Sequence, residues 1–496
     1  MFYTIYITML VLPLVGIFII LFLNKVNKNV IKNIGFIISI IIFISSVFLI
    51  VNFDKSTIKL QYLTNTTWIK DTYQPLFYEF AVDGISIFFV LLTTFIFPLC
   101  YISAWSLINK FDLFNLKFFI INLLILEFFL LNAFLTTNLL LFFFFFESVL
   151  IPMFFIIGCW GPGDRRKKAN YYFVFYTIAG SALLLFSILV IFIDMGTLSY
   201  IYIFEPTHDS FSLSKKLQII LWLFFFLSFA VKVPMFPFHI WLPEAHVEAP
   251  TVGSVILAAL LLKLGGYGFI RFLPLFVYAY NYYMPLVFSL ALLSLVYASL
   301  SAIRQIDLKK IIAYSSIAHM NLSILGVFSL TYQGIQGSLF LLISHGLVSS
   351  ALFFLVGMLY DRYHTKLLKY YGGLVIKMPI FSIYFFFFSV SNLAFPGTSN
   401  FISELLVLVG LAEKNLTIAI FAATGMLFSS IYSIWLFNRL VFGNVKLTFI
   451  DNYQDLTQRE FILLLPLVFF TLLLGLIPDI ILEISYCSIK GLITFI

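Results

Sequence analysis

Long apolar runs decide what this chain can fold into. The sequence of 496 residues contains about fourteen of them, each of roughly 20 residues, which is the length at which an α-helix crosses a bilayer. The runs cover residues 3–22, 31–52, 85–105, 117–135, 137–157, 169–193, 217–242, 251–273, 277–299, 308–330, 334–359, 379–411, 416–438 and 460–484. They predict an all-α polytopic membrane protein. Only the connections 53–84 and 439–459 leave room for structure outside the membrane.

Composition and charge agree with this class and exclude others. Hydrophobic residues make up 62% of the chain and charged residues 10%, far more apolar than a soluble core requires. The net charge of +7 does not indicate nucleic-acid binding, because the basic residues lie in short loops, most of them on one side of the predicted topology. With those loops inside, both termini are predicted outside. The three cysteines have neither metal-site nor disulfide spacing, and no cofactor-binding motif appears.

Two of the apolar runs each carry one lysine. The run 217–242 contains Lys232, which is followed by Pro234 and Pro237. Proline removes a backbone donor and clashes with the preceding turn, so a broken helix is predicted there. The run 251–273 carries Lys263 near its middle. A charge at that depth costs about 3 kcal/mol on insertion scales, which favours a functional role for both lysines.

A second interrupted run indicates an internal repeat. Pro396 and Gly397 interrupt the run 379–411 at a place that corresponds to the first break. Matching breaks in two five-helix units predict inverted repeats. The expected organisation is an N-terminal three-helix segment (1–116), a first repeat (117–273), a second, inverted repeat (277–438), and a loop with a C-terminal helix (439–496).

Further ionisable residues lie inside the predicted membrane helices. Glu147 stands about 15 Å from either end of its run, at the depth expected for Lys232 and Lys263. One interpretation is a buried ion pair that only fixes helix packing. Buried pairs stabilise poorly against apolar replacements, however, and a third charge would stay unpaired. A functional role is therefore favoured.

Two histidines lie on polar stripes between Lys263 and a second glutamate. Ser315, His319 and Ser323 share one helical face, and Ser338, His345 and Ser349 form a similar set. Asn400 and Glu404 are four residues apart, just after the second break. A single histidine in an apolar helix is usually a packing residue, but the combination predicts a hydrated proton path. His239 and His246 are interpreted first as loop-capping residues.

Longer motifs carry a resemblance to a known family. They begin with VDGIS at 82–86 and the stretch 146–181, which starts with FESVLIPMFF, and continue at 230–268, 307–321 and 395–408. In these stretches the chain resembles chain 4 of the respiratory NADH:ubiquinone oxidoreductase (complex I), a family related to antiporter-like subunits of cation/proton antiporters. The resemblance covers nearly the whole chain.

The resemblance implies a function, partners and a location. It implies a proton-translocating membrane-arm subunit of the enzyme with no redox centre of its own; NADH, FMN, iron–sulfur clusters and ubiquinone are expected in partner subunits. Neighbouring antiporter-like chains and lipid, cardiolipin among them, are the expected contacts. The location implied is the mitochondrial inner membrane, with both termini on the intermembrane-space side, or the plasma membrane of a bacterium. The matched functional positions are Glu147, Lys232, Lys263, His319, His345 and Glu404.

These positions suggest an electrostatic mechanism. When Glu147 moves away from Lys232, the uncompensated cation repels the charge on Lys263 and favours release of its proton. The proton then leaves through the two histidines toward Glu404, while a partner subunit drives the cycle.

Two alternatives remain open from the sequence. A cation/proton antiporter subunit would share the fold, and a purely structural subunit would use the charges only for packing.

Overall fold

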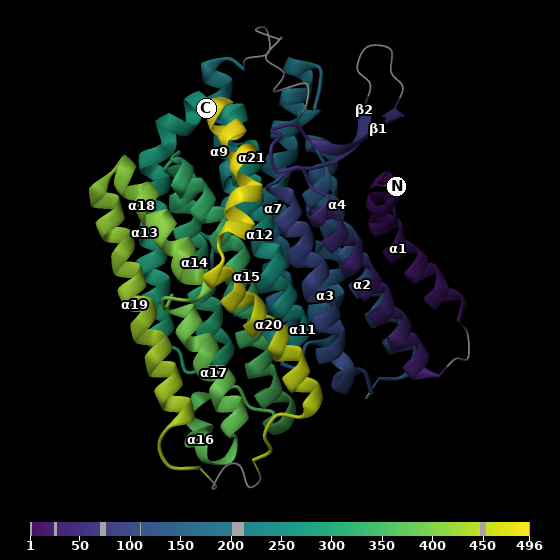
Figure 1. Cartoon of the computed structure of the whole chain (residues 1–496), viewed down its shortest axis with the longest axis vertical. Coiled ribbons are helices and arrows are strands. Elements are labelled where there is room, and N and C mark those ends of the chain that lie inside the picture. The colour runs from purple at the N-terminus through teal and green to yellow at the C-terminus, as the bar shows by residue number, and fades with distance from the viewer. Residues whose placement is uncertain are drawn as a thin grey trace.

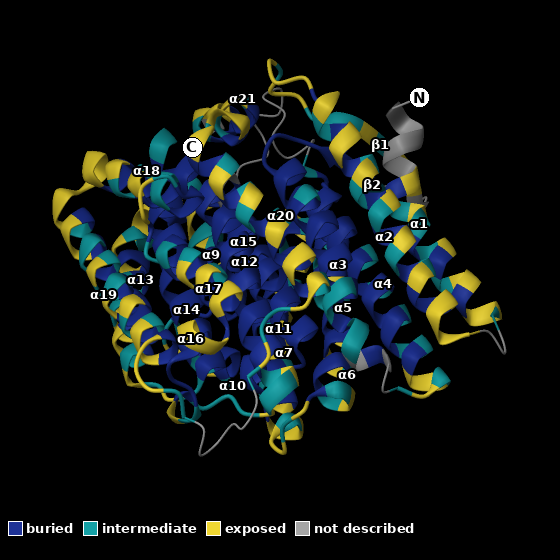
Figure 2. Ribbon diagram, turned by 60° about the horizontal axis from the view of Figure 1, so that its bottom comes forward, coloured by how far each residue is buried: buried dark blue, intermediate teal, exposed yellow. Residues whose placement is uncertain are grey.

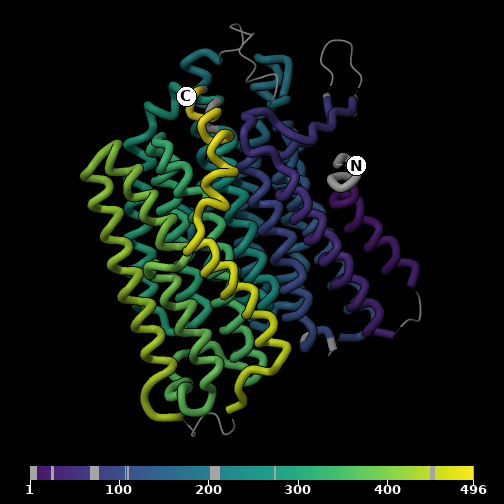
Figure 3. The backbone as a smooth tube through the Cα atoms, in the orientation of Figure 1, coloured from purple at the N-terminus to yellow at the C-terminus, as the bar shows by residue number. Residues whose placement is uncertain are grey.

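The structure is a computed structural model that describes residues 2–23, 27–69, 76–109, 111–200, 213–446 and 453–495. Within these ranges, eleven helices are long and apolar enough to cross a membrane, and shorter apolar helices accompany them. The helices lie side by side in one bundle (Figures 1 and 3). This arrangement confirms the predicted all-α polytopic fold. The count of fourteen spans and the inverted repeats stay predictions.

The N-terminal part forms one flank of the bundle. Its elements are α1 (Phe2–Phe22), α2 (Lys28–Val51), β1 (Gln61–Ile69), β2 (Leu76–Val82) and α3 (Ser86–Asn109). The two strands pair antiparallel, with Thr64 opposite Phe80, and fill the connection that the sequence left free for structure. Both chain ends lie toward the end of the bundle that carries this hairpin (Figure 1).

The middle part contains the first broken helix. Its elements are α4 (Leu113–Leu135), α5 (Leu139–Ser148), α6 (Leu150–Trp160), α7 (Arg166–Met195), α9 (Lys215–Lys232), α10 (Trp241–Glu248), α11 (Thr251–Ile256), a π-helical turn (Leu257–Leu261) and α12 (Leu262–Phe272). Helix α9 ends at Lys232, before the two prolines, as predicted. The indole Nε1 of Trp241 donates to the carbonyl of Val231 at 2.9 Å and so satisfies an acceptor near the break.

The remaining helices contain the second break. They are α13 (Val277–Arg304), α14 (Leu308–Phe328), α15 (Tyr332–Tyr363), α16 (Leu374–Lys377), α17 (Pro379–Asn392), α18 (Ser399–Lys414), α19 (Leu416–Val441), α20 (Gln458–Leu476) and α21 (Asp479–Phe495), with short 3-10 turns at Leu273–Phe276 and Leu368–Tyr370. The chain between α17 and α18 includes Gly397 at φ +95°, a backbone conformation that favours glycine. The predicted break is therefore confirmed.

The last predicted span is wrong in its extent. Residues 460–484 were expected to form one helix, but α20 ends at Leu476 and α21 begins at Asp479. Pro478 stands between the two helices, and a proline restricts the residue before it away from helical geometry. Pro478 was visible in the sequence, but it lies close to the C-terminal end of the apolar run 460–484.

Burial increases toward the centre of the bundle. Helices α14 and α15 and the segment from α11 to α12 are buried along almost their whole length, whereas α19 and α1 expose apolar residues on their outer faces (Figure 2). Exposed apolar faces on outer helices suit contact with lipid or with other membrane subunits. Three of the six predicted functional residues, Lys263, His319 and His345, lie on these buried helices.

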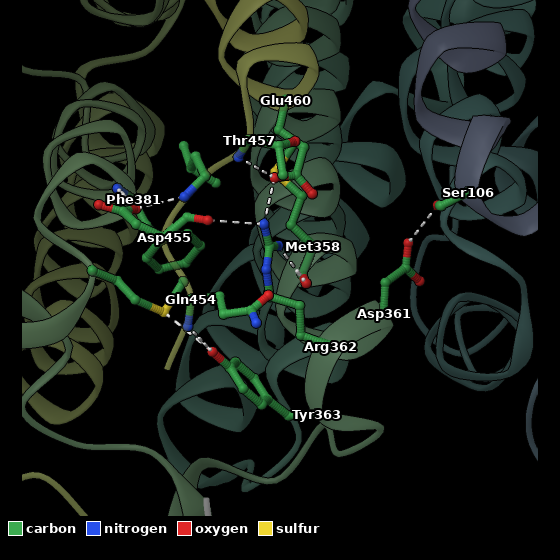
Figure 4. A network of polar contacts seen from close by, with 12 residues as sticks. Ser106, Met358, Asp361, Arg362, Tyr363, Phe381, Gln454, Asp455, Thr457 and Glu460 are labelled. Carbon is green, nitrogen blue, oxygen red and sulfur yellow. Dashed lines mark hydrogen bonds and ion pairs between the residues drawn. The ribbon is translucent and has the colours of Figure 1, made fainter. Parts of the chain in front are cut away.

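A polar network fixes one end of this core (Figure 4). Arg362, near the end of α15, donates to the carbonyls of Met358 and Asp455, each at 3.1 Å, and to Oε2 of Glu460 at 2.5 Å. The carboxylate of Asp455 accepts from the backbone amides of Ile380 and Phe381 at the start of α17. One guanidinium group thus helps to hold α15, α17 and α20 together.

We expect Arg362→Met to destabilise the assembled protein. The substitution leaves the carboxylate of Glu460 poorly solvated and without its cation, which costs about 2–4 kcal/mol. The measurement is the thermal dissociation temperature of the intact membrane assembly. Lys55→Met is the matched control, because the Lys55–Glu483 pair is 53% and 61% exposed and such pairs contribute about 0–1 kcal/mol. An Arg362 effect no larger than that of the control contradicts this assignment.

Candidate functional site

Lys263 lies at the centre of the candidate site. Its side chain is fully buried, and its ammonium group donates to the carbonyl of Ala258 at 2.6 Å. Ala258 belongs to the π-helical turn that precedes α12. A π-helical turn shifts the hydrogen-bond register, and such turns are frequent at functional sites. The second partner of the ammonium is Nδ1 of His345 on α15, at 2.8 Å.

Two further contacts continue from His345. Its ring centroid lies 5.5 Å from that of His319 on α14. Nδ1 of His319 lies 2.9 Å from Oε1 of Glu404, on the second turn of α18 after the second break. Lys263, His345, His319 and Glu404 therefore form one continuous buried row, and none of the four is more than 4% exposed. We call this row the central relay.

The tautomer of His345 follows from its partners. While the Lys263 side chain is an ammonium group, which has only donors, Nδ1 accepts and the neutral ring carries its hydrogen on Nε2. Nε2 is buried and has no protein partner among the described residues. The hydroxyl of Tyr432 on α19 lies 3.4 Å from Nε2 of His319. Among the described residues no hydrogen bond joins the two rings, so proton transfer between them needs an intermediary such as an internal water.

Glu147 and Lys232 lie apart from the central relay. Within the described part of the chain, Lys232 makes no ion pair or hydrogen bond through its ammonium group, which lies 4.3 Å from the ring centroid of Phe146. Glu147 is an electrostatic neighbour of Lys232 but not a direct partner. The buried ion pair considered for Glu147 is therefore not formed in this structure. The ring attracts the cation and so partly stabilises it. The ammonium group can still move toward a carboxylate.

A close helix contact brings Lys232 toward the Lys263 helix. A Cβ atom added at Gly265 would lie 2.7 Å from Cγ2 of Val233 and 3.1 Å from Cβ of Lys232. The glycine therefore lets α12 approach the end of α9 closely. Lys232 and Lys263 therefore sit on two helices in direct contact.

The predicted polar stripes are only partly available for transport. The hydroxyls of Ser315, Ser323 and Ser338 donate to carbonyls of their own helices. The hydroxyl of Ser349 and both side-chain polar atoms of Asn400 are buried without partners among the described residues. Ser315, Ser323 and Ser338 thus bond back to their own backbones, as serine in an apolar helix commonly does, and the hydrated proton path stays a prediction.

The two histidines after the first break are buried rather than loop-capping. His239 lies among the rings of Phe236 and Tyr297, and His246 stacks on Phe353 with 4.7 Å between centroids. Neither ring nitrogen of His246 has a protein partner within the described residues. The capping interpretation is wrong for His246, which lies inside α10.

No group of three or more potential metal ligands is found within the described ranges.

Some contacts of the site were not predicted. Tyr432 is one of 27 tyrosines, and nothing in its sequence surroundings marks it. Ser344 and Ser403, whose hydroxyls lie 3.2 Å apart, link α15 to α18 beside Glu404. Both contacts join residues far apart in sequence, and only the helix arrangement brings them together.

Comparisons with known proteins agree with this geometry. Residues 136–431 match the family model described as NADH:quinone oxidoreductase/Mrp antiporter, TM. A protein of Chondrus crispus named NADH-ubiquinone oxidoreductase chain 4 is 48% identical over 480 residues, which are 96% of this chain and 95% of that protein. A protein of the same name from Arabidopsis thaliana is 47% identical over 482 residues, covering 97% and 95%. In the structure of respiratory complex I from Thermus thermophilus with bound NADH, one chain superimposes with a TM-score of 0.86 at 26% identity, covering 99% and 98% of the two chains.

Proposed function

The chain belongs to the chain 4 family of NADH-ubiquinone oxidoreductase, a family of antiporter-like proton-translocating membrane-arm subunits, and we propose that it moves protons through the central relay under control of Glu147 and Lys232. The observation that carries this proposal is the unbroken row from Lys263 through His345 and His319 to Glu404. Four titratable side chains from four different helices meet there inside an apolar bundle. Helix packing alone does not require these four titratable side chains to lie next to one another.

Each imidazole can pass a proton by accepting on one nitrogen and releasing from the other. A proton from the Lys263 ammonium enters His345 at Nδ1, and the hydrogen on Nε2 leaves toward His319. A water or the Tyr432 hydroxyl carries it to Nε2 of His319. The hydrogen on Nδ1 of His319 then passes to the carboxylate of Glu404. The first and last transfers use atoms that are already in contact, and the transfer between the two rings needs the intermediate group.

Glu147 and Lys232 act on the charge at Lys263. While Glu147 stays near Lys232, its negative charge compensates the positive charge of Lys232. Lys232 then repels the Lys263 ammonium group only weakly. Withdrawal of Glu147 exposes the Lys232 charge across the close contact at Gly265, and repulsion then drives the proton of Lys263 into the central relay. The unpaired position of Lys232 supports this scheme, because no bond within the protein has to break first.

Partners and location are part of the proposal. The redox reaction that drives the cycle takes place in partner subunits, and neighbouring antiporter-like chains flank this one in the membrane arm. The membrane is the mitochondrial inner membrane, with both termini on the intermembrane-space side. Support comes from the relatives in a red alga and a plant, from the charge bias of the loops and from the position of both chain ends at one end of the bundle.

The alternative of a cation/proton antiporter subunit receives less support. The family model includes Mrp antiporters, but the relatives at 43–48% identity are named as chain 4 of the oxidoreductase. The carboxylate of Glu404 also gives the His319 ring a proton acceptor, whereas an ammonium group at position 404 could only donate.

The proposal is tested with His345→Gln in the intact complex. Glutamine keeps a polar side chain next to Lys263 but cannot accept a proton on one atom and release it from another. We expect NADH-driven proton uptake into sealed vesicles to fall at least about tenfold, with assembly unchanged. Ser350→Ala is the control, because that hydroxyl bonds only to its own helix. Full pumping in His345→Gln contradicts the route.

A further inference from the structure

A buried carboxyl group lies outside the central relay, between α3 and α4. Glu127 on α4 is 0% exposed, and neither of its carboxyl oxygens has a hydrogen-bond partner among the described residues. None of the ion pairs within those residues includes it. An unpaired carboxylate inside a membrane bundle is costly, so this side chain needs either a proton or a partner.

The polar neighbours of Glu127 come from α3. Cys100 and Tyr101 are its electrostatic neighbours, and both side chains are buried. The hydroxyl of Tyr101 also has no hydrogen-bond partner within the described residues. On its other side the Tyr101 ring lies against α2 at Gly35, where an added Cβ would be 2.9 Å from Cε1. The Tyr101 ring is therefore in close contact with α2.

Phenylalanine rings separate this place from Glu147. Phe128 and Phe129, the residues after Glu127, pack on Phe145 with 6.2 and 6.3 Å between centroids. Phe145 precedes Glu147 by two residues. Aromatic rings supply no hydrogen-bonding atoms for proton transfer, so Glu127 has no visible connection to the relay on this side.

We propose that Glu127 and Tyr101 form a second buried proton-binding site, in which Glu127 is a neutral carboxylic acid joined to the Tyr101 hydroxyl through one internal water. A neutral acid has one O–H donor and acceptor oxygens, and a phenol has one donor and one acceptor, so the two groups satisfy each other. The bound proton stays in place during turnover. It holds α3 against α4 by hydrogen bonding rather than by charge.

The test is a double-mutant cycle in the intact complex, with thermal dissociation temperature and proton pumping as readouts. Glu127→Leu and Tyr101→Phe should each lower the dissociation temperature, because each leaves the other group unpaired, and the double variant should lose less than the sum of the two shifts. Additive shifts overturn the pairing. Glu127→Gln, which keeps shape and neutrality, should retain pumping within about twofold of wild type.

Two further measurements test whether Glu127 is protonated and whether it is independent of the central relay. In infrared spectra, Glu127→Gln should remove one protonated-carboxyl stretch, and Tyr101→Phe should shift it. If neither variant changes such a band, Glu127 is ionised and the proposal is wrong. Glu147→Gln is the matched control for pumping, since it changes the same chemical group on the neighbouring helix. Should Glu127→Gln lose as much pumping as that control, Glu127 belongs to the relay and the second site does not exist.

Discussion

We expect Lys263→Met to abolish proton pumping by this chain. Methionine has nearly the same length and suits a buried position, so the bundle keeps its packing while the titratable group is lost. Loss of a positioned proton donor costs about 10²-fold or more in rate. The measurement is NADH-driven acidification in sealed vesicles, normalised to the amount of assembled complex.

Lys263→Arg separates proton exchange from charge alone. Arginine keeps the positive charge and donors for the Ala258 carbonyl, but it does not release its proton under physiological conditions. We therefore expect this variant to pump as poorly as Lys263→Met. If Lys263→Arg pumps like the wild type, the residue serves only as a fixed charge, and the relay does not start there.

Glu404→Gln is expected to have the second largest effect. The amide retains the size of the side chain and can accept a hydrogen bond from Nδ1 of His319, but it cannot take up a proton. Protons that reach His319 then have no acceptor, and we expect pumping to fall at least about tenfold. The assay is the same vesicle measurement.

A second substitution at position 404 tests the antiporter alternative. Glu404→Lys places an ammonium group against the His319 ring, so proton transfer should stop as in Glu404→Gln. Sodium-dependent proton movement in either the wild type or this variant would support a cation antiporter. Wild-type pumping in Glu404→Gln would instead show that the path leaves the bundle elsewhere.

Much of the architecture could be predicted from local signals. Apolar runs of membrane length predicted the helices, and Pro234, Pro237 and Pro396 predicted the two broken ones, because a proline acts on its own turn. Glu147, Lys232 and Lys263 were marked as candidates because each places a charge inside an apolar run, where a charge is costly. Each of these signals depends on a few neighbouring residues.

Contacts between distant residues were less predictable. Lys263 and His345 are 82 positions apart, and their contact at 2.8 Å depends on how α12 meets α15. The π-helical turn at Leu257–Leu261 has no marker in a run of leucine and alanine. The sequence also suggested that Glu147 pairs with Lys232, whereas the ammonium lies over Phe146. Glu127 was passed over, although a carboxylate within an apolar run was a visible signal.

The relay as a whole is tested most directly by a structure of the native membrane arm with ordered waters resolved. The account predicts a water, or a shortened Tyr432 contact, that joins Nε2 of His345 to Nε2 of His319, with Lys263 and Glu404 in contact at the two ends. A dry gap between the two rings, or a Glu404 turned away from His319, would contradict it.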